Sequence, residues 1–287
     1  MRDEPSSTAE SVCLFRAADR QRPVGTRILD DPYAELFLGA GTRAALAAFR
    51  ATGWLGSRVE RRVPGLAAFV VARHRQIDDW LVRALESSVE QVVLLGAGYD
   101  TRAQRFAKEL RGRPVFELDF PATQRRKRRV VKQYAKRMPE VDVRWVPIDF
   151  LSERIDVKLL EAGFRPGARS FFVWEGVSMY LTREAVKETL RALRALAGLG
   201  SELAMDWWYL LDDPSALGTL HRATPSLLHL LGEPVTLSLH PEDVGAFLER
   251  EGYELLELAD AAALEARYVR DDRSVYPATY LVLCRTR

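Results

Sequence analysis

The chain has 287 residues and a nearly balanced charge, with 42 basic and 40 acidic residues and a formal net charge of +2. This balance excludes an overall nucleic-acid or membrane-binding footprint, and no stretch reaches the roughly 18 apolar residues that a membrane span requires. Cys13 and Cys284 lie at opposite ends of the chain, which favours a reducing compartment over a disulfide framework. We therefore expect a cytoplasmic α/β enzyme without a metal-ligand cluster.

The first 88 residues are predicted to form a helical cap over a ligand site. Residues 1–30 are polar and mixed, and a short helix ending at Leu38 should follow the sequence DDP. The alanine-rich stretch from Ala40 to Ala51 favours a second helix. From Ala67 to Glu86 apolar residues recur three and four positions apart, which is the pattern of an amphipathic helix.

The stretch QVVLLGAGYDTRAQRF, which follows the cap, contains the strongest ligand-binding signal. Gln91 to Leu95 is an almost unbroken apolar run, as expected of a strand buried on both faces of a parallel sheet. Gly96 and Gly98, on either side of Ala97, allow a sharp turn and a close approach of the backbone to a ligand. The pattern predicts the nucleotide-binding half of a doubly wound α/β domain, which runs from residue 89 to residue 287.

The helix after this loop determines which nucleotide fits. Asp100 and Thr101 supply N-cap chemistry, and Arg102, Gln104 and Arg105 indicate a polar-faced helix. The dinucleotide fingerprint requires a third glycine at the position that Thr101 occupies, so a pyrophosphate is poorly provided for. S-adenosylmethionine, which has a ribose and an adenine but no phosphate, fits this loop.

A second strand, Pro114 to Leu118, ends at two acidic residues. Glu117 and Asp119 lie about twenty residues after the glycine loop, where a carboxylate can accept hydrogen bonds from ribose hydroxyls. Pro121 then opens a helix with a basic run from Arg125 to Arg129. The run has no interleaved aromatic residues for stacking on bases, so we favour a solvated outer face over a nucleic-acid patch.

Two further strands end in polar residues. DVRWVPIDF ends at Asp149 and Phe150, and Asp149 is either a ligand contact or the N-cap of the next helix. The apolar strand SFFVW leads to Glu175, which must lie at the carboxyl end of the strand because an unpaired buried carboxylate is costly. Thr182 is a plausible cap for the helix that follows, which Gly198 ends.

The last third of the chain contains the predicted substrate region. SELAMDWWYL is predicted as the fifth strand, and its end clusters Asp206 with three aromatic residues. Residues 210–240 are predicted to form a helical lid that selects the acceptor, although ordinary helical packing explains the pattern equally well. HPEDVGAFLEREGYELLEL and ATYLVLCR then indicate a helix and two strands, for seven strands in total.

Three motifs carry a resemblance to a known family. GAGYDTR, FELDFP with its basic helix, and WEGVSMYL resemble the leucine carboxyl methyltransferase family, whose bacterial branch includes tetracenomycin-type polyketide carboxyl O-methyltransferases. AADRQRPVGTRILDDPYAELF and VVARHRQIDDWLVRAL agree in order and spacing, so the resemblance extends to about Trp208. It implies a class I, Rossmann-like methyltransferase fold with S-adenosylmethionine as cofactor and an antiparallel last strand.

The resemblance also implies roles for single residues. Arg73 aligns with the arginine that binds the carboxylate of the methionine moiety, whereas the alternative is a solvated pair with Arg75. Arg20 matches another basic residue near the cofactor, and Tyr180 matches a residue of the reaction pocket. The full predicted cofactor-binding set is Arg73, Gly96, Ala97, Gly98, Asp100, Asp119, Phe120, Asp149, Phe150 and Glu175. A departure is His74, where the bacterial relatives usually carry a small residue.

The expected reaction is methyl transfer to a small-molecule carboxylate in secondary metabolism. A carboxylate is ionised at neutral pH and needs no base, whereas a hydroxyl acceptor would require one. His221, beside Arg222, is then the main candidate, with His229 and His240 as others, although lone histidines are usually structural. Together with Tyr180, His221 and Arg222 form the predicted catalytic set.

Other functions stay open at this point. A protein C-terminal carboxylate is an alternative acceptor. A nicotinamide-dependent oxidoreductase is disfavoured by Thr101, and a non-catalytic cofactor-binding regulator would bind the cofactor tightly beneath a closed lid. We expect a monomer or homodimer without nucleic-acid or membrane partners.

Overall fold

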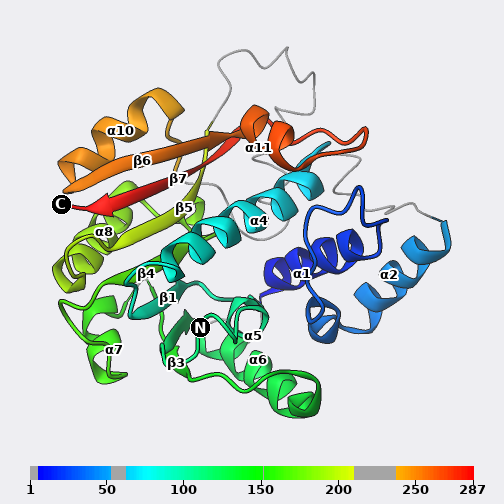
Figure 1. The fold of residues 1–287 in the computed structure, drawn as a ribbon, viewed down its shortest axis with the longest axis horizontal. Helices are drawn as coiled ribbons and strands as arrows, with labels where there is room; N and C mark the ends of the chain where they lie inside the picture. The colour runs from blue at the N-terminus through cyan, green and yellow to red at the C-terminus, as the bar shows by residue number, and fades with distance from the viewer. Residues whose placement is uncertain (1–5, 53–62, 151, 210–236) are drawn as a thin grey trace.

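Seven strands form one mixed sheet in the computed structural model, which describes residues 6–52, 63–150, 152–209 and 237–287 (Figure 1). The strand order is β3-β2-β1-β4-β5-β7-β6. Strands β1 to β5 pair in parallel, whereas β7 pairs antiparallel with both β5 and β6, as predicted. The strands are β1 Gln91–Leu95, β2 Val115–Asp119, β3 Val143–Pro147, β4 Ser170–Trp174, β5 Glu202–Trp208, β6 Tyr253–Asp260 and β7 Thr279–Thr286.

Helices cover both faces of the sheet because the central strands are apolar on both sides. Every residue of β1 and β4 is buried, and alternate side chains of these strands enter two separate hydrophobic clusters. Helices α4 and α11 share one cluster with the sheet, and α7, α8 and α10 share the other. The helices are α1 Ser7–Arg20, α2 Ala40–Thr52, α4 Leu66–Leu85, α5 Arg102–Arg105, α6 Pro121–Gln133, α7 Ile155–Glu161, α8 Arg183–Leu196, α10 Pro241–Arg250 and α11 Ala261–Tyr268, with short 3-10 turns η1 Ala34–Phe37, η2 Ala135–Arg137 and η3 Ser178–Tyr180.

The N-terminal stretch is helical in its described part. Helix α4 lies across the sheet, whereas α1 and α2, in blue, lie to one side of the sheet (Figure 1). A third cluster joins α1, η1 and α2 to Tyr99 of the glycine loop. Helix α4 is therefore part of the main core, and the division of the chain into a cap and a core stays a prediction.

Some predicted elements differ from the structure. Helix α1 was not predicted, although Ser6 caps it by accepting a hydrogen bond from the Ala9 amide. Helix α11, capped by Asp260, was also missed. The predicted polar-faced helix after the glycine loop is wrong, because α5 has only four residues and buries Arg102 and Gln104.

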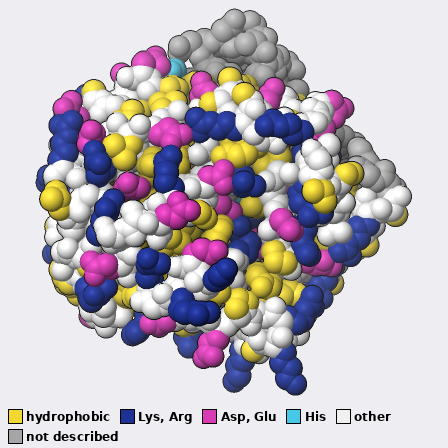
Figure 2. All heavy atoms as spheres, viewed as in Figure 1, with side chains coloured by type: hydrophobic (Ala, Val, Ile, Leu, Met, Phe, Trp, Pro, Cys, Tyr) yellow, Lys and Arg dark blue, Asp and Glu magenta, His cyan; other side chains and the backbone are white. Residues whose placement is uncertain are grey.

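The basic helix α6 corrects another prediction. Arg125, Arg128 and Arg129 are exposed, as a solvated face requires, but Lys127 is 1% exposed. Its ammonium lies 2.6 Å from the Glu117 carboxylate on β2, which is equally buried. On the face shown in Figure 2, basic and acidic side chains are interspersed rather than segregated.

Two boundaries change the interpretation of loop residues. Strand β3 ends at Pro147, so Asp149 and Phe150 lie in the loop beyond it. Asp149 is not the cap of the next helix, because α7 begins at Ile155 with Arg154 at its N-cap position.

Residues 210–236, most of the predicted lid, lie outside the described residues. Within the described part of the chain, no helix combines the length and apolarity needed to cross a membrane.

Candidate functional site

The glycine loop after β1 has the conformation that the sequence predicts. Gly96 and Gly98 have φ values of 65° and 46°, in the left-handed region that favours glycine. A β-carbon at Gly96 would overlap with Cγ2 of Val177, so the loop after β4 packs directly on this glycine. The amide of Ala97 donates to the Leu118 carbonyl at 2.9 Å, which ties the loop to β2.

Of the two acidic residues of β2, Asp119 is the last residue of the strand, at the carboxyl end of the parallel strands. Its carboxylate accepts hydrogen bonds from the amides of Gly98 and Phe120. Glu117 instead pairs with Lys127 in the interior, and burial raises the pKa of the Glu117 carboxyl to about 7 despite the neighbouring ammonium. Asp119, and not Glu117, therefore lies beside the glycine loop, and its role in binding a ligand stays a prediction.

Arg73 of α4 connects the ends of β4 and β5. Its Nε lies 2.9 Å from Oε1 of Glu175, and its Nη1 lies 2.7 Å from Oδ2 of Asp206. The other Asp206 oxygen accepts a hydrogen bond from the Gly176 amide at 2.7 Å. Arg73 is 4% exposed, so the alternative of a solvated arginine is wrong for this residue. The solvated alternative is correct for Arg75, which forms an exposed ion pair with Asp79.

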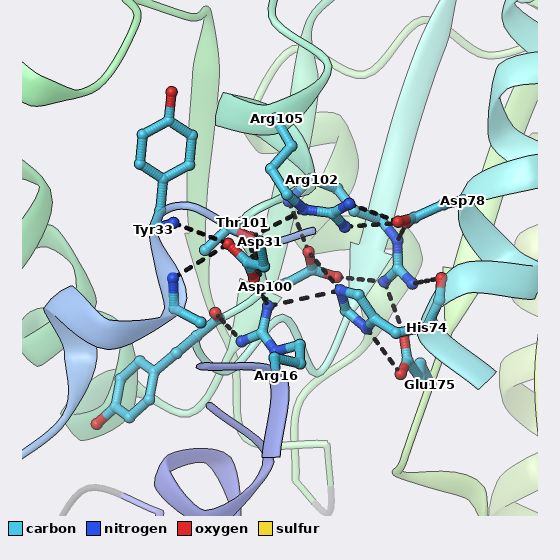
Figure 3. Close-up of polar contacts among 12 residues, drawn as sticks. Arg16, Asp31, Tyr33, His74, Asp78, Asp100, Thr101, Arg102, Arg105 and Glu175 are labelled. Atoms are coloured by element: carbon cyan, nitrogen blue, oxygen red, sulfur yellow. Dashed lines mark hydrogen bonds and ion pairs between the residues drawn. The ribbon is translucent and has the colours of Figure 1, made fainter. Parts of the chain in front are cut away.

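Arg102, at the start of α5, joins three carboxylates from three segments. Its Nη1 lies 2.6 Å from Oε2 of Glu175 and also contacts Asp100, while its Nε lies 2.7 Å from Asp78 of α4. Arg105, one turn later, also binds Asp78. Figure 3 shows these side chains converging between α4 and the glycine loop. The fold therefore gathers charges that the sequence places far apart.

A further buried arginine comes from α1. Arg16 Nη1 lies 2.6 Å from Oδ2 of Asp31, and Arg16 Nη2 donates to the Tyr99 carbonyl at 2.7 Å. The Thr101 hydroxyl donates to the same Asp31 oxygen. Thr101, the residue at the third glycine position, thus connects the loop to the N-terminal helices. Sequence reasoning missed Arg16. It noted Arg20 as a match to a basic residue near the cofactor, but the Arg20 side chain is 40% exposed and pairs with Asp30.

His74 lies in the middle of these groups (Figure 3). Its Nδ1 is 3.0 Å from Oε1 of Glu175, and its Nε2 is 3.5 Å from Nη1 of Arg16 and 3.9 Å from Oδ1 of Asp100. Burial and the charge of Arg102 lower the pKa of His74 below its ordinary value, against the opposing effect of Glu175. The imidazole is therefore neutral at physiological pH.

We define the site network as these ten ionisable side chains, each with at most 10% of its side chain exposed. The members are Arg16, Asp31, Arg73, His74, Asp78, Asp100, Arg102, Arg105, Glu175 and Asp206. Burial alone would raise the pKa of the Glu175 carboxyl, but the hydrogen bond from His74 and the charges of Arg102 and Arg73 hold this pKa well below its usual value. Four guanidiniums and five carboxylates then leave one net negative charge beside a neutral histidine.

The fold brings together a group of potential metal ligands that the sequence did not reveal. The ligand atoms of His74, Asp100 and Glu175 lie within 4.8 Å of one another. Arg102 already binds both carboxylates, and Arg73 binds Glu175. A cation placed there would have to displace two buried guanidiniums, so the donor set does not fit a metal.

The remaining predicted residues have mixed outcomes. Tyr180 lies in η3, which Ser178 ties to β5 by a hydrogen bond to the Asp206 carbonyl. His240 precedes α10, and its ring packs against Tyr209. His221, Arg222 and His229 lie outside the described residues. The cofactor and catalytic roles of all these side chains stay predictions.

Comparison with known proteins gives a family match over most of this architecture. A model of the leucine carboxyl methyltransferase family matches residues 9–194. A protein of Frankia alni named as a candidate S-adenosyl-L-methionine-dependent methyltransferase is 31% identical over 284 residues, which cover 97% of this chain and 93% of that protein. A similarly named protein of Parafrankia is 34% identical over 200 residues, which cover 69% of this chain but only 62% of the relative.

Solved structures share the fold at low sequence identity. A DUF574 family protein from Streptomyces avermitilis has a TM-score of 0.62 and 17% identity, over 99% of this chain and 98% of that one. Magnesium protoporphyrin IX methyltransferase from Synechocystis, solved with bound S-adenosylhomocysteine, has a TM-score of 0.50 and 10% identity, over 86% and 95% of the two chains. The fold is that of class I methyltransferases, as predicted.

Proposed function

Because the chain belongs to the leucine carboxyl methyltransferase family, and is an S-adenosylmethionine-dependent methyltransferase, we propose that it methylates the carboxylate of a small molecule such as a polyketide. The family match over residues 9–194 is the observation that carries this proposal. When bound, S-adenosylmethionine supplies an electrophilic methyl group on a sulfonium. The residues of this chain have to bind, orient and shield the two reactants.

The charge of the site network supports a sulfonium cofactor. S-adenosylmethionine carries an ammonium, a sulfonium and a carboxylate, and hence one net positive charge. The network carries one net negative charge in a buried setting, where opposite charges attract more strongly than in water. A dinucleotide, with its anionic pyrophosphate, would be repelled by the same network.

Individual side chains fit parts of this cofactor. Within the described residues, Arg73 uses Nε and Nη1 for Glu175 and Asp206, so its Nη2 remains for the carboxylate of the methionine moiety. Asp119 is suited to the ribose hydroxyls. Glu175 is suited to the ammonium. We assign Asp149 and Phe150, in the loop after β3, to the adenine as the family resemblance implies.

Aromatic side chains pack against Arg73 and hold it in the site network. The Arg73 guanidinium lies over the Phe69 ring, with its carbon 5.3 Å from the centroid. The Phe69 ring packs edge-on against Trp208 at 5.9 Å, and Trp208 packs against Tyr276 at 5.8 Å. These rings are buried, with Phe69 0% and Trp208 7% exposed, and Trp208 lies on the side of β5 that also holds Asp206, so the aromatic packing fixes Arg73 within the site network.

The chemistry that the protein must provide is modest for a carboxylate. An ionised carboxylate oxygen attacks the methyl carbon, the carbon–sulfur bond breaks, and no proton has to move. Orientation of donor and acceptor then accounts for much of the rate. A hydroxyl acceptor would release a proton to a base, and among the described residues His74 is already engaged by Glu175 and Arg16.

Both cysteines are buried and neither forms a disulfide, which agrees with the proposal of a cytoplasmic enzyme.

The test is methyl transfer from labelled S-adenosylmethionine to matched pairs of aromatic carboxylic acids and phenols. We expect base-labile methyl esters from the acids. Arg73→Lys, which keeps the charge but loses the planar fork, should weaken cofactor binding by about tenfold or more. Arg75→Ala is the matched control, because Arg75 lies on the same helix in an exposed pair. Methylation of phenols alone would refute the carboxylate preference, and binding of NAD in place of S-adenosylmethionine would refute the cofactor assignment.

A further inference from the structure

His74 is not required by the roles given above, yet it is the central side chain of the site network. It is 2% exposed and faces charged groups from several segments. These groups are Arg16 of α1, Asp100 and Arg102 around the start of α5, Glu175 after β4, and Asp78 of its own helix. An uncharged ring at this position contributes hydrogen bonds without changing the charge balance.

The two ring nitrogens have different neighbours, which determines the tautomer. Nδ1 lies 3.0 Å from a Glu175 oxygen, and an ionised carboxylate can only accept, so Nδ1 must carry the proton. Nε2 lies 3.5 Å from Nη1 of Arg16, which also donates to Asp31, and 3.9 Å from Oδ1 of Asp100. Because a guanidinium can only donate, a neutral ring with its proton on Nδ1 directs the Nε2 lone pair at Arg16. A second proton on Nε2 would point at Arg16 and remove this contact.

We propose that His74 is a positioning residue that sets the charge of the cofactor site: its neutral Nδ1–H tautomer holds Glu175 and leaves the network with one negative charge for the sulfonium cofactor. Protonation of His74 would cancel that charge. The inference rests on the proposed assignment of the network as the cofactor site.

The consequence is a pH-dependent preference between cofactor and product. S-adenosylmethionine carries one more positive charge than S-adenosylhomocysteine, because the product has lost the sulfonium. Protonated His74 would therefore repel the cofactor more than the product. Below the pKa of His74 in the ligand-free protein, cofactor affinity should fall relative to product affinity. Burial depresses this pKa, so the change should occur on the acidic side of the ordinary histidine range.

The binding test compares the dissociation constants of both ligands by calorimetry between about pH 7 and about pH 5, with circular dichroism at each pH to verify folding. In the natural protein, the preference for S-adenosylmethionine over S-adenosylhomocysteine should fall by about three- to tenfold across this range. His74→Asn keeps a donor near the Nδ1 position but cannot be protonated, so the part of the pH dependence that comes from His74 should be absent, whereas the titration of Glu117 is common to both proteins. Arg75→Ala, next along the helix, should behave as the natural protein.

Two results would overturn the proposal. One is the same pH-dependent change of preference in His74→Asn as in the natural protein. The other comes from nitrogen-15 NMR of the histidine rings in the ligand-free protein, with His74→Asn used to assign the His74 signals. A protonated ring or an Nε2–H tautomer at about pH 7 contradicts the assignment. Because the NMR measurement needs no ligand, it separates failure of this inference from failure of the proposed function.

Discussion

The buried ion pair between Lys127 of α6 and Glu117 of β2 gives the sharpest stability prediction. Both side chains are 1% exposed, and the ammonium lies 2.6 Å from a carboxylate oxygen. Among the described residues, neither Glu117 oxygen nor Lys127 Nζ has a further well-aligned hydrogen bond. The pair thus has charge compensation but little additional support, so its desolvation cost is poorly offset.

Lys127→Met removes the cation and leaves Glu117 buried without a partner. Loss of one member of such a pair typically costs about 3–5 kcal/mol of unfolding free energy. The double variant Glu117→Leu with Lys127→Met removes both charges and fills similar volume, so it should recover most of that loss. Urea denaturation followed by tryptophan fluorescence measures both free energies.

The pH dependence gives an independent check on the same pair. Burial raises the pKa of the Glu117 carboxyl to about 7, above its unfolded value. The stability contributed by this group is therefore fully present below the unfolded pKa and is lost as the pH rises through about 7. Lys127→Met should be most destabilising at alkaline pH and least at about pH 5. A loss below about 1 kcal/mol at every pH, or a double variant no more stable than the single one, would refute the reasoning.

Three other substitutions test the packing around the site. Gly96→Ala should lower the unfolding free energy by about 1–3 kcal/mol in thermal unfolding, because the new methyl group overlaps with Val177 and because alanine is strained at a positive φ. Adding Val177→Ala should restore only the stability lost through the overlap, and the strain should remain. Asp206→Ala should cost about 1–3 kcal/mol in urea denaturation, because the buried Arg73 loses one of its two carboxylate partners and keeps Glu175, and a loss within error of zero would contradict that ion pair. Thr182→Ala should cost about 1 kcal/mol, because the Thr182 hydroxyl caps α8, whereas Thr182→Ser should not.

Local patterns in the sequence determined much of the fold. The apolar runs of β1 and β4, the glycine loop between β1 and α5, and the cap at Thr182 were predicted at their observed positions. Each depends on neighbouring residues only: burial on both faces requires continuous apolar strands, and a positive φ favours glycine. Placement of Glu175 at the end of β4 followed from the cost of burying an unpaired carboxylate.

Only the tertiary structure decided how the charges pair. Arg102 and Arg105 look like the solvated side of a helix, and Lys127 looks like part of a basic surface, because a sequence shows charge but not the partner that permits burial. The partners are distant in the chain: Glu175 lies 73 residues from Arg102, and Asp206 lies 133 residues from Arg73. Parallel strands bring such residues to one edge of the sheet, where burial makes their pairing obligatory, and this pairing gives the site its charge.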